Sequence, residues 1–260
     1  MPFTTRNDVR IHYEVHGEGP PVVFNPPPFA DRRFYQLTGH LEALRTRHRV
    51  ILIDPRGHGQ SDRPREPGAH RIDEYRDDLT AVLNAADVGR AVFVGPYDGI
   101  FVAYALAVES PDRVSGLIDY DAIEGSDLCD PPECNERQNF AQRLRTGGVE
   151  TLREHVKSYG VSDENPIGKN IVASDPEMVA LELEAWTSWR GPFSLLPRLR
   201  VPTLFLRNGE TGRAAVDRIR QVAADWAEIH VLQGVSHWSL VTEVAHTLPM
   251  VRNFLGRLES

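Results

Sequence analysis

The chain has 260 residues, a length that fits one domain with an insertion or two small domains. Its 41% hydrophobic and 25% charged residues are ordinary for a globular protein and exclude a disordered chain. The 29 Lys and Arg residues against 37 Asp and Glu residues give a net charge of -8. Because the sequence shows no basic patch to offset this charge, nucleic acid is excluded as an expected partner.

Two features of the sequence bear on its location. No apolar run approaches the roughly 20 residues that a membrane-spanning helix needs, so no membrane contact is expected. Residues 1–10 have no apolar core of a signal peptide. We therefore expect a soluble, cytoplasmic protein in which Cys129 and Cys134 are free thiols rather than metal ligands. The oligomeric state stays open, a homodimer included.

Short apolar runs alternate with amphipathic segments along most of the chain. Residues 9–15 alternate with a period of two, as a strand of an edge hairpin does. Runs typical of strands buried on both faces lie at 21–25, 49–54, 91–95, 114–121, 201–209 and 227–234. Segments with helical spacing lie at 34–47, 72–88, 99–110, 214–225 and 244–258. This order predicts an α/β fold, with a mostly parallel twisted sheet flanked by helices.

Residues 122–190 interrupt the alternation. This segment is polar, has helical spacing and shows no strand pattern. We predict that it is a helical cap, or lid, inserted into an α/β core made of residues 1–121 and 191–260.

Five segments, in order along the chain, resemble the α/β-hydrolase superfamily. They are PVVFNPPP (21–28), DPRGHGQS (54–61), VGPYDGI (94–100), VPTLFLRNGE (201–210) and GVSHW (234–238). They resemble, respectively, the family's third strand with its oxyanion loop, a structural turn, the nucleophile elbow, the strand before the usual acid, and the turn with the catalytic histidine. The resemblance covers nearly the whole chain and implies the α/β-hydrolase fold. The chemistry must be argued residue by residue, because fold does not determine function.

The elbow segment places Tyr97 where the family carries its nucleophile. The elbow needs small residues two positions before and two after the nucleophile, and Gly95 and Gly99 meet that need. A phenol with a pKa near 10 is only about 0.1% ionised at pH 7, so Tyr97 is a poor nucleophile. It is expected to be a hydrogen-bond donor or acid, or else to fill a dead pocket. The adjacent Asp98 is expected to contact the substrate or to face solvent.

The loop that resembles the oxyanion loop reads Asn25-Pro26-Pro27-Pro28. Proline has no N–H, so these positions offer no backbone donor. Loss of one such donor typically lowers turnover about 10²–10³-fold in acyl transfer. The side-chain amide of Asn25 is the expected substitute. The sequence therefore argues against ordinary serine-esterase chemistry.

The resemblance implies that His237 is the catalytic histidine. The position of the family's usual acid is Gly212, so another carboxylate must orient the imidazole. Asp121, at the end of the predicted strand 114–121, and Glu210, beside the lost acid, are the two candidates. Without such a partner a triad histidine loses tautomer control, an effect worth up to about 10⁴ in rate.

These residues indicate a general-base enzyme that has abandoned acyl-enzyme chemistry. His237 would take a proton from a small apolar or aromatic substrate, with Tyr97 as hydrogen-bond donor or acid and Asp121 orienting the base. The expected substrate contacts are Asn25, Asp98, Trp186, Trp189 and Trp238. Lyase, isomerase, cyclase and cofactor-free oxygenase reactions fit, with no metal or cofactor. The alternatives are a hydrolase in which His237 activates water against a C–C, epoxide or ester substrate, and a non-catalytic small-molecule binder.

Overall fold

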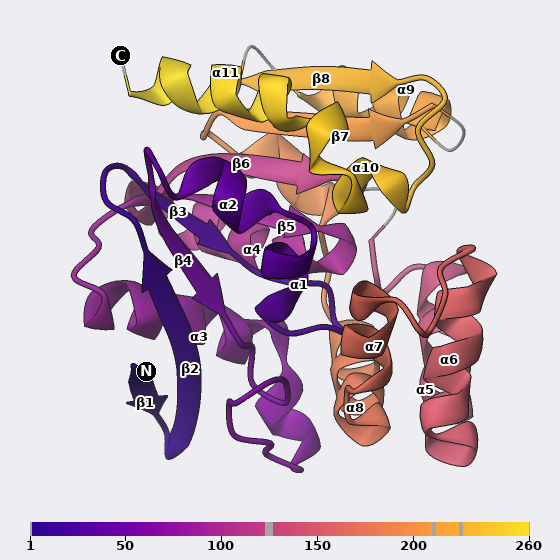
Figure 1. Ribbon diagram of the computed structural model, residues 1–260. Coiled ribbons are helices and arrows are strands. Elements are labelled where there is room, and N and C mark those ends of the chain that lie inside the picture. Colours follow the sequence, from indigo (N-terminus) through magenta and orange to yellow (C-terminus); the bar gives the residue numbers. More distant parts are fainter. Residues whose placement is uncertain (1, 123–126, 210–211, 224–225, 260) are drawn as a thin grey trace.

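Among the residues that the computed structural model describes (2–122, 127–209, 212–223 and 226–259), eight strands form one twisted sheet (Figure 1). Its strand order is β1-β2-β4-β3-β5-β6-β7-β8, antiparallel at β1–β2 and β2–β4 and parallel elsewhere. The strands are β1 (Phe3–Arg6), β2 (Val9–His16), β3 (Pro21–Phe24), β4 (Arg49–Ile53), β5 (Ala91–Pro96), β6 (Val114–Tyr120), β7 (Thr203–Asn208) and β8 (Ala227–Leu232). The predicted fold class is confirmed. The sequence pattern missed β1, which takes the edge position expected for residues 9–15.

The helices follow the predicted segments with two interruptions. The expected helix over 34–47 is divided into two helices at Gly39, which has a φ of +83°. Within the segment 122–190, Gly148 separates two further helices in the same way. The α-helices are α1 (Arg33–Leu37), α2 (His40–Leu44), α3 (Ile72–Ala85), α4 (Phe101–Glu109), α5 (Glu133–Gly147), α6 (Val149–Ser158), α7 (Pro166–Val172), α8 (Pro176–Trp186), α9 (Gly212–Val222), α10 (Ser239–Thr242) and α11 (Leu248–Leu258). Short 3₁₀ turns are η1 (Pro67–His70), η2 (Tyr97–Ile100), η3 (Pro111–Arg113), η4 (Phe193–Arg198) and η5 (Val244–His246). In the described part of the chain, no helix is long and apolar enough to cross a membrane.

Alternating side chains of the central strands divide the core between the two faces of the sheet. On β3, Val22 and Phe24 belong to the cluster that includes residues of α1, α2 and α11, whereas Val23 belongs to the cluster that includes α3 and α4. This is the alternation that the pleat imposes, and both faces are apolar because helices cover both. Because β5, β6, β7 and β8 are parallel neighbours in the sheet, their carboxyl ends lie side by side at one edge of the core.

Helices α5 to α8 lie between β6 and β7 in the chain and form a separate layer beside the sheet (Figure 1). They have their own apolar cluster, and α8 is anchored to the core by polar contacts. Glu182 on α8 accepts a hydrogen bond from the Tyr75 hydroxyl at 3.1 Å and pairs with His58 Nε2 at 2.9 Å. His58 thus has a structural role. The action of this layer as a lid, and its predicted boundaries at 122 and 190, stay predictions.

A sharp turn after β5 depends on two glycines. A Cβ on Gly95 would lie 2.5 Å from the backbone nitrogen of Ile100, and one on Gly99 would lie 2.5 Å from the carbonyl oxygen of Pro26. Between them Tyr97 has a φ of +50°, a left-handed conformation that is uncommon for a bulky residue. The strand-to-helix turn is therefore as tight as the elbow spacing predicts.

We expect stability to fall with acid because His40 is buried as the neutral imidazole. Burial lowers the pKa of His40 to about 3, against about 6.5 in an unfolded chain. Between these values the unfolded state binds more protons, so the free energy of unfolding falls as the pH falls, by at most about 1.4 kcal/mol per pH unit for one group. Urea unfolding of His40→Gln between pH 6.5 and 4.5 should show a shallower dependence on pH. A slope equal to that of the exposed-site control His246→Gln would contradict this.

Gly99→Ala should destabilise the protein by about 1–3 kcal/mol, because the new methyl group has no room against Pro26. The matched control is Gly256→Ala on α11, where an added Cβ meets no atom within 4 Å. That change should be neutral or stabilising by up to about 1 kcal/mol. Urea midpoints measure both variants, and equal midpoints for the two would show that the turn tolerates a side chain.

Candidate active site

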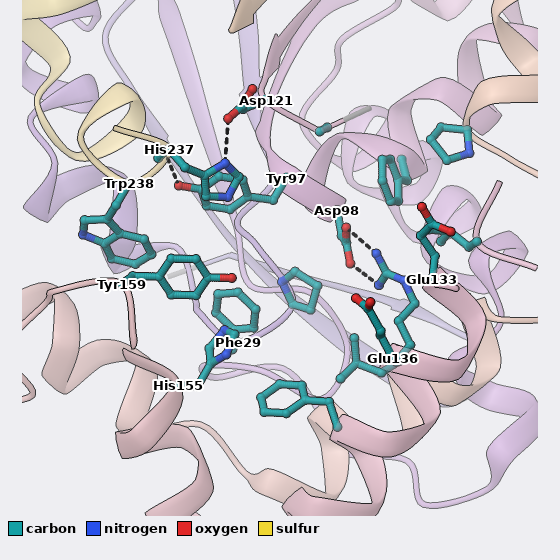
Figure 2. Close-up of a pocket in the computed structure, with 18 residues that line it drawn as sticks. Phe29, Tyr97, Asp98, Asp121, Glu133, Glu136, His155, Tyr159, His237 and Trp238 are labelled. Atoms are coloured by element: carbon teal, nitrogen blue, oxygen red, sulfur yellow. Dashed lines mark hydrogen bonds and ion pairs between the residues drawn. The ribbon is translucent and has the colours of Figure 1, made fainter. Parts of the chain in front are cut away.

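His237 and Asp121 form a dyad at the carboxyl end of the sheet. His237 lies in the turn between β8 and α10, and its Nδ1 is 2.6 Å from Oδ2 of Asp121, which directly follows β6 (Figure 2). The Asp121 carboxylate also accepts a hydrogen bond from the side-chain amide of Asn208, at the end of β7. A carboxylate can only accept, so the neutral imidazole carries its proton on Nδ1 and leaves the Nε2 lone pair as a base. Of the two predicted orienting acids, Asp121 is in contact with His237, while Glu210 lies outside the described residues.

Tyr97 contacts both the backbone and the imidazole ring of His237. Its hydroxyl donates to the His237 carbonyl oxygen at 2.9 Å, and its ring stacks on the imidazole with centroids 4.2 Å apart and planes 26° apart. Burial, followed by the charges of Asp121 and Tyr159, raises the pKa of Tyr97 well above 10. The expected role as a donor or acid toward substrate therefore needs correction, because the hydroxyl is already engaged and is not acidic.

A cavity of about 290 Å³ separates these residues from the helical layer (Figure 2). Half of its eighteen lining residues are apolar, which suits the apolar part of a small molecule, and five of the others are charged. The apolar lining residues are Pro28, Phe29, Phe101, Ala122, Leu128, Phe140, Leu183, Pro192 and Trp238. Tyr159 enters from the end of α6, with its ring nearly parallel to those of His237 and Trp238 at centroid distances of 5.9 and 6.1 Å.

An ion pair joins the elbow to the helical layer across this cavity. The guanidinium of Arg137 on α5 contacts both carboxylate oxygens of Asp98, with Nη2 2.9 Å from Oδ1. Glu133 and Glu136 on the same helix also line the cavity (Figure 2). Asp98 lines the cavity, and its partner there is the Arg137 guanidinium, so its expected contact with a substrate stays a prediction.

Three predicted substrate contacts lie elsewhere. The Asn25 amide donates to the Gly99 carbonyl oxygen at 2.7 Å and so braces the elbow, and its expected substitution for the oxyanion donor is not supported. Trp186, the last residue of α8, is 1% exposed and packs against Tyr75 of α3. Trp189 packs against Phe101 outside the cavity lining. Trp186 and Trp189 were thus predicted to contact a ligand but instead contact the core.

The sequence did not indicate His155, a second imidazole at the cavity. It lies between Phe29 and Phe140, with centroids 5.0 and 4.7 Å away, and burial, with a smaller effect of Arg143, lowers its pKa to about 4. His155 is therefore neutral at pH 7. A lone histidine within an amphipathic helix carries no sequence signal that separates it from a surface residue. Among the described residues, no group of three or more His, Cys, Asp or Glu side chains has the arrangement of a metal site.

Comparisons with known proteins agree with this fold. The family model for the alpha/beta hydrolase fold matches residues 32–148. A protein of Azorhizobium caulinodans named for a carbamate hydrolase, RutD, is 35% identical over 117 residues, which are 45% of this chain and 43% of that protein. The 2-hydroxymuconate semialdehyde hydrolase of Pseudomonas sp. strain CF600 is 25% identical over 259 residues, covering 95% of this chain and 87% of the relative.

Solved structures extend the likeness over the whole fold. A thermophilic esterase from Thermogutta terrifontis superposes with a TM-score of 0.84 at 24% identity, covering 99% of this chain and 97% of the esterase. The first curated relatives align over less than half of their own length, so their activities do not transfer directly. The sheet order, the elbow after β5, the histidine turn after β8 and these matches together show that the chain has the α/β-hydrolase fold.

Proposed function

We propose that this protein is an enzyme in which His237, oriented by Asp121, acts as a general base without forming a covalent enzyme intermediate. The observation that carries the proposal is the 2.6 Å contact of His237 Nδ1 with the buried Asp121 carboxylate, which leaves Nε2 as a base at the cavity. When Nε2 accepts a proton, the resulting imidazolium would be stabilised by the same carboxylate. The substrate class that suits the lining is small and apolar or aromatic.

Hydrolysis is the reaction class that the names of the relatives favour, and in this chain it would use an activated water molecule. Their names include a carbamate hydrolase, epoxide hydrolases and a hydrolase of 2-hydroxymuconate semialdehyde. In this reaction Nε2 would take a proton from water as the oxygen attacks the substrate. Tyr97 leaves no serine at the elbow to form an acyl-enzyme, which is why the water must attack directly.

Proton abstraction from a substrate carbon is the second candidate, and it would use the same nitrogen. Pro26, Pro27 and Pro28 lack the N–H that stabilises a tetrahedral oxyanion in acyl transfer, so their presence favours C–C, epoxide, lyase or isomerase chemistry over ester hydrolysis. A non-catalytic binder would use the same cavity without the base. One experiment can distinguish these three functions.

His237→Ala should lower turnover at least about 10²-fold, since general bases typically contribute 10²–10⁴-fold. Asp121→Asn should lower it as well, because the amide no longer fixes the tautomer. Wild type and variants are assayed with aryl esters, epoxides, 1,3-diketones and enolisable ketones by mass spectrometry. The matched control is His230→Ala, which removes an imidazole paired with Glu228 at 2.6 Å on β8, outside the cavity.

An active His237→Ala variant would contradict the general-base proposal. If wild type converts none of these compounds, yet binds one of them equally well with and without His237, the protein is a binder. Loss of activity in His230→Ala to the same extent would show that the effect is not specific to the cavity.

Tyr97→Ser should gain little hydrolysis of p-nitrophenyl esters, even though it recreates a serine elbow. Pro27 still offers no N–H to the oxyanion, a deficit worth about 10²–10³ in turnover. The double variant Tyr97→Ser/Pro27→Gly should therefore hydrolyse the ester faster than the single variant. Turnover of about 1 s⁻¹ or more in the single variant, a typical enzymatic rate, would show that another donor completes the oxyanion site. Wild type should resist labelling by fluorophosphonates at this cavity.

A further inference from the structure

The elbow keeps its strained geometry although its central residue is not a usable nucleophile. Tyr97 has a φ of +50°, and Gly95 and Gly99 are both required by contacts closer than a Cβ allows. A tyrosine that only filled space would not need a left-handed backbone, which side chains of its size rarely adopt. This conformation directs the side chain toward one target, the turn that carries His237.

Tyr97 makes two separate contacts with that target. Its hydroxyl donates to the His237 carbonyl oxygen at 2.9 Å, and its ring covers one face of the imidazole at 4.2 Å (Figure 2). Asp121 contacts the Nδ1 edge of the same ring. The backbone, one face and one edge of His237 are thus each contacted by a different group, and Nε2 is the ring nitrogen left for the cavity.

The histidine turn needs such support from the core. It follows β8, the terminal strand of the sheet, whose residues are all partly or fully exposed. The turn begins at Gly234, with a φ of +71°, and the side chain of His237 itself is 26% exposed. Glycine and exposure both increase the conformational freedom of a turn. In this protein, Tyr97 and Asp121, which directly follow β5 and β6, restrict that freedom.

We propose that Tyr97 is a positioning residue that holds the His237 imidazole in one orientation and one tautomer, a role that rests on the proposed function of His237 as the base. The hydroxyl contact fixes the turn and the stacked ring fixes the plane of the imidazole. Together they keep Nδ1 in reach of Asp121. The residue at the elbow therefore serves the base instead of attacking the substrate.

The test measures the tautomer of the His237 imidazole directly and needs no substrate. Protein labelled with ¹⁵N-histidine gives long-range ¹H–¹⁵N spectra in which the two neutral tautomers have different cross-peak patterns, and the His237→Gln variant assigns the His237 signals. At pH 8.5, where an ordinary imidazole is neutral, wild type should show the Nδ1–H pattern. Tyr97→Leu removes the ring and the hydroxyl, and Tyr97→Phe removes the hydroxyl alone.

The Nδ1–H to Nε2–H ratio should fall at least about threefold in Tyr97→Leu, with a smaller fall in Tyr97→Phe, because each lost contact lets the ring leave Asp121. The matched control is Tyr35→Phe, which removes a buried tyrosine hydroxyl that donates to the Asn25 carbonyl oxygen at 2.8 Å and not to His237. A ratio in both Tyr97 variants equal to that in Tyr35→Phe would overturn the proposal. Tyr97→Phe keeps the ring, so it remains informative if Tyr97→Leu does not fold.

The two proposals can fail separately. If His237→Ala retains activity while the Tyr97 variants change the tautomer ratio, the general base is wrong and the positioning contact stands. If His237→Ala abolishes activity and the ratio does not change, the base stands and Tyr97 has another role.

Discussion

The hydrogen bond between His237 and Asp121 is the constraint on which the site depends. It joins the turn after β8 to the end of β6, two segments that are 116 positions apart in the sequence. They meet because β5, β6, β7 and β8 are parallel neighbours whose carboxyl ends share one edge. Parallel α/β sheets generally bind ligands at this edge. The acid follows β6, and the amide of Asn208 at the end of β7 donates to it.

The fold was largely predictable because burial on two faces leaves a clear pattern. Short apolar runs predicted six of the strands within a few residues, because a strand covered by helices on both sides needs apolar side chains on both faces. The alternation of residues 9–15 predicted β2. The residues of β1 are partly or fully exposed, so no hydrophobic pattern marked them. The helix expected over 34–47 was divided at Gly39, because spacing alone does not show where a glycine takes a left-handed conformation.

The site was predictable only where a residue follows a strand or a tight turn. The resemblance to the α/β-hydrolase superfamily predicted His237, Tyr97, Asp98 and Asp121, and all four line the cavity because each follows a strand or lies in a tight turn. Contacts made by long side chains were not predictable. Arg137 belongs to a polar helix like many others, and its pairing with Asp98 follows from how the helical layer packs. The aromatic residues of that layer carry the same signal whether they contact a ligand or, as Trp186 does, the core.

The elbow has become the structural centre of the site. Three consecutive residues contact three distant segments: Tyr97 the histidine turn, Asp98 the guanidinium of Arg137 on α5, and Gly99 the loop before α1 through the Asn25 amide. In a serine hydrolase of this fold the elbow presents a nucleophile and must leave its hydroxyl free. Here the central hydroxyl is engaged, and the turn instead fixes the relative positions of the base, the helical layer and the proline loop. Glycines at the elbow spacing therefore indicate the turn, and the residue between them decides whether the turn carries a nucleophile or holds other groups in place.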